Sequence, residues 1–254
     1  MARVSLHPQF LLRPIAHRGY HDKVLRRPEN SLSAFQAAID AGYGIELDVQ
    51  LTADGQAVVF HDETLDRMTT ESGAVVGRTT ATLGTFRLCD SDDFIPTLPD
   101  VLSLVAGQVP VLIEIKDCMD TMSETSGKLE AAVATALEGY KGPVAVMSFN
   151  PHCIINMQAM APEIARGLTT EAYDPQASLP IPPDTCARLR MIPDFEDAGC
   201  SFISHQATDL NRPRVAELKS QGADILCWTI RSPAAEARAR LIAQNITFEG
   251  YAAT

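Results

Sequence analysis

The sequence predicts an α/β protein of the TIM-type (β/α)8 barrel class, with a small insertion after the second βα segment. Short apolar runs alternate with longer stretches of helical periodicity along the whole chain, as expected for a parallel sheet covered by helices. The length of 254 residues suits about eight βα units in one catalytic barrel domain over residues 1–254. An open doubly wound sheet is the competing architecture, but the chain contains neither G-x-G-x-x-G nor G-x-x-x-x-G-K-[ST].

The short apolar runs are the predicted strands. They occupy residues 15–17, 44–50, 57–61, 109–116, 144–149, 164–168, 201–205, 225–230 and 245–248. The helices predicted between them occupy residues 31–41, 98–106, 123–138, 152–160, 212–221 and 233–244. Glycines just past predicted helices, where a left-handed cap is expected, are Gly42, Gly107, Gly139 and Gly222.

Residues 62–97 fit poorly as a plain connection between a strand and a helix. The stretch is rich in Thr, Asp, Gly and Arg. We interpret it as an insertion over one end of the barrel that is too short to form a second domain.

The charge and the cysteines limit the partners and the compartment. Lys and Arg number 21 against 32 Asp and Glu, and this net charge of −11 disfavours binding to nucleic acid or to an anionic membrane surface. No apolar run approaches the ~18 residues of a membrane span. No two of the six cysteines form C-x-x-C, so we expect reduced thiols, mostly buried. We expect a cytoplasmic protein without stable membrane association, and the sequence does not specify its oligomeric state.

Three acidic residues lie in two of the predicted strands. Glu46 and Asp48 are two positions apart, so their side chains point to the same face of the strand, and Glu114 occupies a similar apolar context. Buried carboxylates need a cation, and three oxygen donors suit Mg²⁺ or Ca²⁺ better than zinc. The alternative is a group of rim acids paired with Lys116 and Arg18.

Two histidines close predicted strands beside acidic and basic residues. His17 and His61 are therefore the candidate acid/base pair. Arg18 is suited to bind a phosphate group, or alternatively to pair with an interior acid, and Lys116 supplies a second positive charge. Together with a metal ion, these groups provide the charge neutralisation, proton acceptor and proton donor that phosphodiester cleavage requires.

Two further residues near strand ends complete the candidate site. Trp228 is expected to form a wall of the pocket, unless it belongs to the barrel core. His205 is expected to line the site.

Four stretches in the first half of the chain show a family pattern: AHRGY (16–20), RPENSLSAFQAAIDAG (27–42), IELDVQLTADGQAVVFHDETLDRMTTESG (45–73) and VLIEIK (111–116). VMSFNP (146–151) and ILCWTI (225–230) agree more loosely. In these stretches the sequence resembles the glycerophosphodiester phosphodiesterase family. The resemblance implies a TIM barrel, one divalent cation, and hydrolysis of small glycerophosphodiesters to glycerol 3-phosphate and an alcohol.

The resemblance also implies roles for individual residues. Matched by position, the implied metal ligands are Glu46, Asp48 and Glu114. The implied acid/base pair is His17 and His61. The implied basic residues on the phosphate side are Arg18 and Lys116. We favour His17 as the base and His61 as the acid. Glu29 is a weaker expected contact to the metal or the glycerol. The nucleophile stays open between a glycerol hydroxyl, which gives a cyclic phosphate, and water.

Two departures from the family pattern concern the leaving alcohol. Arg231 stands where the family usually has Asn, and the last strand reads ITFEGYAAT where the family commonly has an Asp-containing turn. We expect both on the leaving-group side of the pocket, so the alcohol is not assigned. Two alternative functions are lysophospholipase D-type cleavage of a lysophospholipid at the same site and non-catalytic binding of a phosphate ester.

Overall fold

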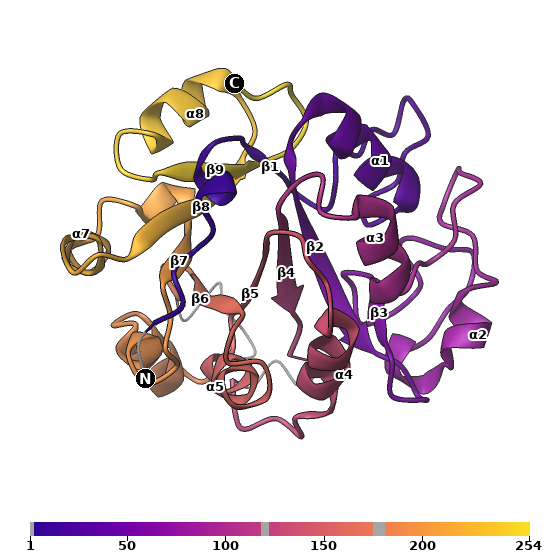
Figure 1. The fold of residues 1–254 in the computed structure, drawn as a ribbon, viewed down its shortest axis with the longest axis horizontal. Helices are drawn as coiled ribbons and strands as arrows, with labels where there is room; N and C mark the ends of the chain where they lie inside the picture. Colours follow the sequence, from indigo (N-terminus) through magenta and orange to yellow (C-terminus); the bar gives the residue numbers. More distant parts are fainter. Residues whose placement is uncertain (1–2, 118–121, 175–180) are drawn as a thin grey trace.

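The computed structural model describes residues 3–117, 122–174 and 181–254, which form a closed barrel (Figure 1). Its wall, within these residues, consists of eight parallel strands: β1 (Ile15–Ala16), β2 (Gly44–Leu51), β4 (Val111–Ile115), β5 (Val144–Ser148), β6 (Ala165–Thr170), β7 (Phe202–Gln206), β8 (Asp224–Ile230) and β9 (Asn245–Phe248). The ring closes because β1 pairs in parallel with both β2 and β9. The predicted TIM-type barrel is confirmed.

Helices cover the outside of the ring of strands (Figure 1). The α-helices are α1 (Leu32–Ala41), α2 (Thr80–Leu83), α3 (Leu98–Val105), α4 (Lys128–Leu137), α5 (Pro151–Met160), α6 (Pro183–Leu189), α7 (Pro213–Ser220) and α8 (Pro233–Ala239). Short 3-10 turns are η1 (Pro8–Leu11), η2 (Val75–Gly77), η3 (Pro193–Phe195) and η4 (Ala207–Asp209). The sequence did not predict α2 or α6, and α4 begins later than predicted, after the left-handed Gly127.

Local sequence explains the boundaries of α1, the helix that follows the first strand. The Ser31 side chain accepts a hydrogen bond from the Ala34 backbone N–H, which satisfies one of the free donors of the first turn. Gly42 ends the helix at φ 70°, a left-handed conformation that glycine adopts without strain. This helix packs Phe35 and Ala38 into the core.

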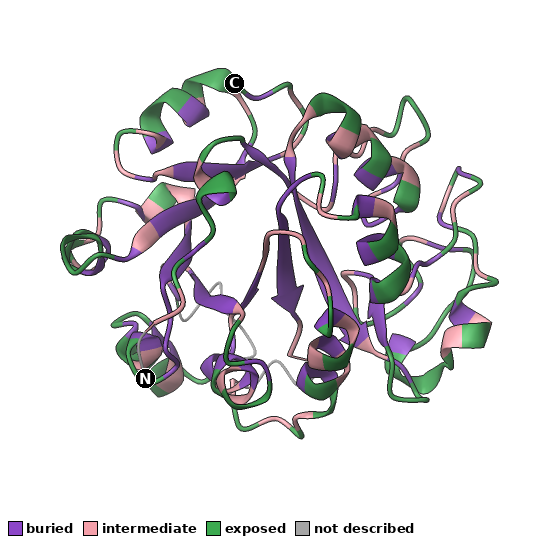
Figure 2. Ribbon diagram, viewed as in Figure 1, coloured by how far each residue is buried: buried purple, intermediate pink, exposed green. Residues whose placement is uncertain are grey.

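The barrel strands alternate between two environments, and this alternation positions the polar residues. Along β2, Ile45, Leu47 and Val49 belong to the core between strands and helices. A separate cluster fills the lower interior of the barrel, where Leu112 lies with Phe10 of η1. Most strand residues are buried, whereas the helices expose their outer faces (Figure 2). Side chains that share the inward face with Leu112 but lie nearer the carboxyl ends of the strands are free to form a pocket.

The predicted strand 57–61 is not a barrel strand, and this part of the prediction is wrong. Its observed part, β3 (Ala57–Val59), runs antiparallel to β2, with Val49 opposite Val59. The chain turns back at Gly55, so β3 returns alongside the end of β2 that projects beyond the barrel. An apolar run identifies a strand but not its direction, which the sequence therefore left unspecified.

The stretch around the predicted insertion has a small core of its own. Val58, Phe60, Leu65 and Leu83 belong to a cluster separate from the barrel cores, and α2 and η2 lie within the stretch. None of the helices in the described parts of the chain combines the length and apolar character needed to span a membrane. Of the cysteines, Cys118 lies outside the described residues, and the other five are unpaired.

Candidate active site

A pocket of about 230 Å³ opens at the carboxyl ends of the barrel strands. It is lined by His17, Arg18, Glu46, Asp48, His61, Glu114, Lys116, Met147, Phe149, Trp228, Thr229, Arg231 and Thr247. The structure therefore brings together the residues that the sequence proposed for the site, except His205 and Glu29, which do not line this pocket.

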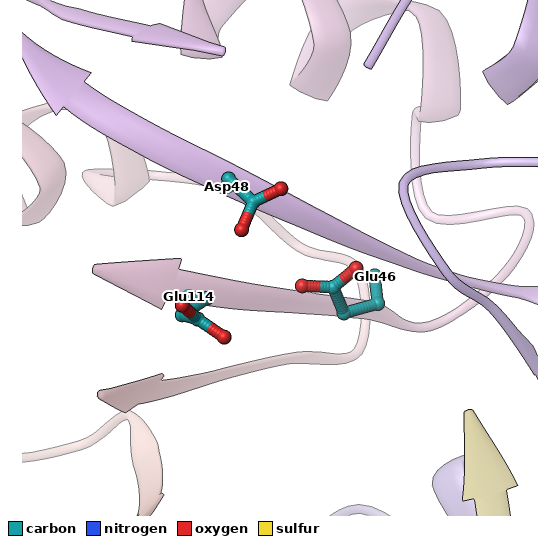
Figure 3. A group of neighbouring side chains, drawn as sticks. All are labelled: Glu46, Asp48 and Glu114. Atoms are coloured by element: carbon teal, nitrogen blue, oxygen red, sulfur yellow. The ribbon is translucent and has the colours of Figure 1, made fainter. Parts of the chain in front are cut away.

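The three carboxylates form a compact group across two strands (Figure 3). Glu46 and Asp48 come from β2, and Glu114 comes from β4, where it is the register partner of Asp48. One oxygen of each lies within 4.8 Å of the others, and all three residues are buried. Burial, together with the charges of Asp48 and Glu114, raises the pKa of Glu46 well above its ordinary value. Such a group of hard oxygen donors, unfavourable while uncompensated, fits a divalent cation.

Lys116 neutralises part of the negative charge of the three carboxylates. Its Nζ donates to Asp48 Oδ1 at 2.8 Å and to Glu114 Oε1 at 2.5 Å. Burial alone would lower the pKa of Lys116, but the two carboxylates outweigh it and hold the pKa above its ordinary range. Burial likewise opposes ionisation of Asp48, yet the Lys116 ammonium and other cationic neighbours hold the pKa of Asp48 low. Lys116 therefore stays charged beside the carboxylate group.

Arg18 lies on a tight turn that directs both its backbone and its side chain toward the acids. Its backbone N–H donates to Glu46 Oε2 at 2.9 Å, and its Nε lies 3.5 Å from Asp48 Oδ2. The turn requires Gly19, at φ 79°, because a Cβ there would fall 2.9 Å from Phe35 Cδ1. This packing explains why a glycine follows the arginine in the sequence.

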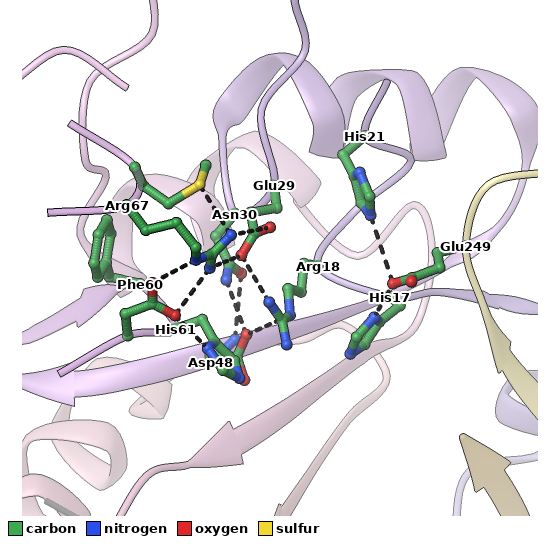
Figure 4. A network of polar contacts seen from close by, with 12 residues as sticks. His17, Arg18, His21, Glu29, Asn30, Asp48, Phe60, His61, Arg67 and Glu249 are labelled. Carbon is green, nitrogen blue, oxygen red and sulfur yellow. Dashed lines mark hydrogen bonds and ion pairs between the residues drawn. The ribbon is translucent and has the colours of Figure 1, made fainter. Parts of the chain in front are cut away.

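A network of residues from the first loop and the insertion supports the acids and His61 (Figure 4). Glu29 accepts from Arg18 Nη1 at 2.7 Å and from Arg67 Nη2 at 2.6 Å. Burial acts against ionisation of Glu29, but these two arginines lower its pKa to about 2. Asn30 Nδ2 donates to Asp48 Oδ2 at 2.9 Å. Sequence reasoning did not single out Arg67, whose role depends on the fold of the insertion.

His61 follows β3 and is oriented by the residue next to it. Its Nδ1 lies 2.8 Å from Asp62 Oδ1, and Arg67 Nε donates to Asp62 Oδ2 at 2.5 Å. Burial and the positive charge of Lys116 lower the pKa of His61, although Asp48 and Asp62 oppose this. His61 thus reaches the pocket from the antiparallel β3, not from the end of a barrel strand as the sequence suggested.

His17 follows β1 and has a carboxylate partner from the other end of the chain. Its Nδ1 lies 2.6 Å from Glu249 Oε2, and Arg231 Nε donates to Glu249 Oε1 at 2.6 Å. His21 Nε2 lies 3.9 Å from Glu249 Oε2. Figure 4 marks the contacts of both histidines with this carboxylate. Sequence reasoning did not select Glu249 as a site residue, although its position directly after the last predicted strand was available as a signal.

Aromatic and apolar side chains form another part of the wall. The rings of Trp228 and Phe149 meet edge to face, with centroids 5.4 Å apart. Trp228 Nε1 donates to the Ser204 carbonyl at 3.0 Å, which satisfies the indole while the ring faces the pocket. Trp228 therefore lies where the sequence placed it.

His205 does not line this pocket. It is fully buried, with Nδ1 2.7 Å from Thr170 Oγ1 and Nε2 3.2 Å from Asp209 Oδ2. Both ring nitrogens are engaged between β6, β7 and η4, so His205 has a structural position in the barrel wall. Sequence position near a strand end does not distinguish a side chain that faces the pocket from one that does not.

The fold and the site define a TIM barrel with a buried carboxylate group and two histidines in one pocket. A sequence profile of the Glycerophosphoryl diester phosphodiesterase family matches residues 17–247. The chain belongs to this family.

Individual relatives agree with this assignment. A glycerophosphodiester phosphodiesterase of Caldanaerobacter subterraneus is 37% identical over 165 residues, which are 61% of this chain and 65% of that protein. A mouse glycerophosphodiester phosphodiesterase 1 is 31% identical over 175 residues, 65% of this chain and 50% of that protein. The matches thus span about two thirds or less of the length of these relatives.

Solved structures are similar over nearly the whole chain. An Oleispira antarctica phosphodiesterase in complex with the product sn-glycerol-3-phosphate has a TM-score of 0.75 at 26% identity, covering 94% of this chain and 93% of that chain. A glycerophosphodiester phosphodiesterase from Thermotoga maritima has a TM-score of 0.70 at 23% identity, covering 93% and 94%. The second similarity supports the fold.

Proposed function

We propose that this protein hydrolyses glycerophosphodiesters to glycerol 3-phosphate and an alcohol. The observation that supports this most directly is the buried group of Glu46, Asp48 and Glu114 in one pocket with two histidines. The similar Oleispira enzyme, with bound sn-glycerol-3-phosphate, supports the same product.

The three carboxylates would hold one divalent cation, Mg²⁺ or Ca²⁺. Their oxygen donors, their burial and the raised pKa of Glu46 fit such an ion. When bound, the cation supplies charge neutralisation for the phosphoryl group. Arg18 and Lys116 would bind the phosphate and stabilise its negative charge as the reaction proceeds.

The two histidines would transfer the protons. In this proposal His17 removes a proton from the nucleophile and His61 donates one to the leaving alcohol. The nucleophile is either a glycerol hydroxyl or water, and detection of a cyclic phosphate by ³¹P NMR distinguishes the two. If His17 is the base, it lies on the side of the attacking group. Arg231 donates to Glu249, and Glu249 contacts His17, so Arg231 lies on the same side. The leaving-group position expected for Arg231 from the sequence does not fit this arrangement.

The wall of Met147, Phe149 and Trp228 favours a lysophospholipid as the second candidate substrate. An acyl chain would contact these apolar side chains while its phosphodiester occupied the same polar groups. Comparing cleavage of glycerophosphocholine and lysophosphatidylcholine by the same preparation decides between the two substrates.

The decisive experiment measures release of glycerol 3-phosphate from glycerophosphocholine and glycerophosphoethanolamine. We expect release that stops with EDTA and returns with Mg²⁺ or Ca²⁺. His17→Ala and His61→Ala should each lower the rate by about 10²- to 10⁴-fold and leave a measurable residual activity, whereas His152→Ala, a histidine outside the pocket lining, should not lower it. Stoichiometric binding of these substrates without turnover would instead support a phosphate-ester binding protein.

We propose a cytoplasmic location, supported by the five described cysteines, which are unpaired and, except for Cys89, buried. The net charge of −11 supports a small-molecule partner over a nucleic acid or a stable membrane contact.

A further inference from the structure

Each histidine of the pocket stands at the end of a chain of charged groups. We name these the His61 chain, which consists of Arg67, Asp62 and His61, and the His17 chain, which consists of Arg231, Glu249 and His17. In both, a carboxylate contacts the histidine Nδ1, and an arginine Nε donates to the other oxygen of that carboxylate. Arg18 lies between the two histidines in Figure 4.

The His61 chain is local, whereas the His17 chain joins the two ends of the sequence. Asp62 is adjacent to His61, and Arg67 is five residues further on. Glu249 is 232 residues from His17. Such a contact forms only when the barrel closes and β9 pairs with β1.

Glu249 is held from several directions. Its backbone N–H donates to the Ile230 carbonyl at 3.0 Å, which fixes the chain after β9 against the end of β8. One carboxylate oxygen accepts from Arg231, and the other faces His17. Its side chain is 20% exposed, so water competes little for these contacts.

The contact between Glu249 and His17 determines which ring nitrogen of His17 is able to accept a proton. A carboxylate accepts a hydrogen bond, so the Glu249 partner keeps the proton of neutral His17 on Nδ1. The Nε2 atom is then unprotonated and able to accept a proton, and the ring is held in one orientation. Arg231 neutralises part of the Glu249 charge and holds its second oxygen.

We propose that Glu249 is a positioning residue for His17: it fixes the Nδ1–H tautomer and ring orientation that the general base requires, and Arg231 holds Glu249 in place. This inference rests on the proposed function and adds to it a residue pair outside the metal ligands and the acid/base pair. Arg231 and Glu249 both lie in the segments where the sequence departs from the family pattern. In this chain the residues at these two places, Arg231 and Glu249, form an ion pair with each other.

The rival explanation is that Arg231 and Glu249 only tie the ends of β8 and β9 together. A structural tie and a positioning role predict different kinetics. Loss of a tie lowers the stability of the barrel, whereas loss of positioning lowers kcat and leaves KM nearly unchanged, because substrate binding does not depend on the His17 tautomer.

The test is a double-mutant cycle on glycerophosphocholine turnover. We expect Glu249→Gln to lower kcat by about 10- to 100-fold, less than the effect of removing the base itself, with KM changed less than about threefold. Glu249→Asp, which keeps the carboxylate, should recover part of the loss. In a His17→Ala background, Glu249→Gln should cause no further loss. An equal loss with and without His17 would overturn the proposal.

A matched control separates these effects from a general loss of stability in the C-terminal part of the barrel. Glu236 of α8 is buried, accepts from Tyr251 Oη at 2.9 Å, and does not line the pocket. We expect Glu236→Gln to lower the melting temperature and to leave kcat unchanged. Arg231→Met should lower kcat less than Glu249→Gln, because the Arg231 side chain is 65% exposed and such pairs contribute little alone.

A readout without turnover keeps the inference separate from the proposed function. In ¹H–¹⁵N NMR of the resting protein, we expect His17 as the Nδ1–H tautomer in the wild type and as a tautomer mixture in Glu249→Gln. An unchanged His17 spectrum in that variant would overturn the positioning role. Failure of the wild type to release glycerol 3-phosphate would overturn the proposed function.

Discussion

Asp48 and Glu114 are direct register partners on β2 and β4, and Lys116 Nζ lies within hydrogen-bonding distance of both carboxylates. Two neighbouring strands thus place like charges side by side on the inner face of the barrel. The lysine partly balances them, while burial and the charges of Asp48 and Glu114 raise the pKa of Glu46 above its ordinary value.

Glu114→Gln should weaken divalent cation binding. A residue that merely orients a metal ligand contributes about 10- to 100-fold to metal affinity, so loss of a direct ligand should cost at least as much. Calorimetric titration with Mg²⁺ and Ca²⁺ measures the change. Glu217→Gln, at an exposed site on α7, is the control, and equal affinities in the two variants would exclude Glu114 as a ligand.

Lys116→Met should destabilise the metal-free protein. It removes the cation that pairs with Asp48 and Glu114, and breaking a buried ion pair costs about 3–5 kcal/mol. Urea unfolding in EDTA measures the loss, with the exposed Lys23→Met as control. Added Mg²⁺ or Ca²⁺ should restore more of the free energy of unfolding in Lys116→Met than in the wild type, since the ion supplies the missing positive charge. Similar stabilisation of both proteins would contradict the idea that Lys116 and the metal ion neutralise the same carboxylates.

The assignment of base and acid predicts different responses to the leaving group. A p-nitrophenolate group leaves without protonation, so glycerol 3-(p-nitrophenyl phosphate) does not need the general acid. We expect His61→Ala to recover much of its loss of about 10²- to 10⁴-fold with this substrate, and His17→Ala to keep its full loss. Recovery by His17→Ala instead would reverse the two roles and make Glu249 the partner of the acid.

The sequence predicted the barrel and the position of most pocket-lining polar residues for the same physical reason. Side chains alternate along a strand, so Glu46 and Asp48 share a face, and the carboxyl ends of parallel strands meet at one rim. These rules are local and can be read from spacing alone. They located the carboxylates, His17 and Trp228 in the pocket, whereas His61 lies there for a different reason.

The features that the sequence did not predict depend on contacts distant along the chain or on strand direction. Glu249 acquires its role only where β9 lies beside β1, and Arg67 only where the insertion folds over the first loop. His61 reaches the pocket because β3 reverses direction, which an apolar run does not encode. For His205, the pattern near the strand end was the same as for a pocket residue, but the side chain is enclosed by Thr170 and Asp209.

His205 also predicts how stability depends on pH. Burial lowers the pKa of His205 below its ordinary value of 6.5, although Asp209 opposes the shift. His205 therefore binds a proton at a higher pH in the unfolded chain than in the folded protein. The contribution of neutral His205 to stability is fully present above pH 6.5. That contribution is lost as the pH falls through the folded pKa. We expect the free energy of unfolding of the wild type to fall between pH 7.5 and pH 5 more steeply than that of His205→Gln, as measured by urea titration. A parallel decline in both proteins would show that His205 does not contribute to the acid sensitivity of the barrel.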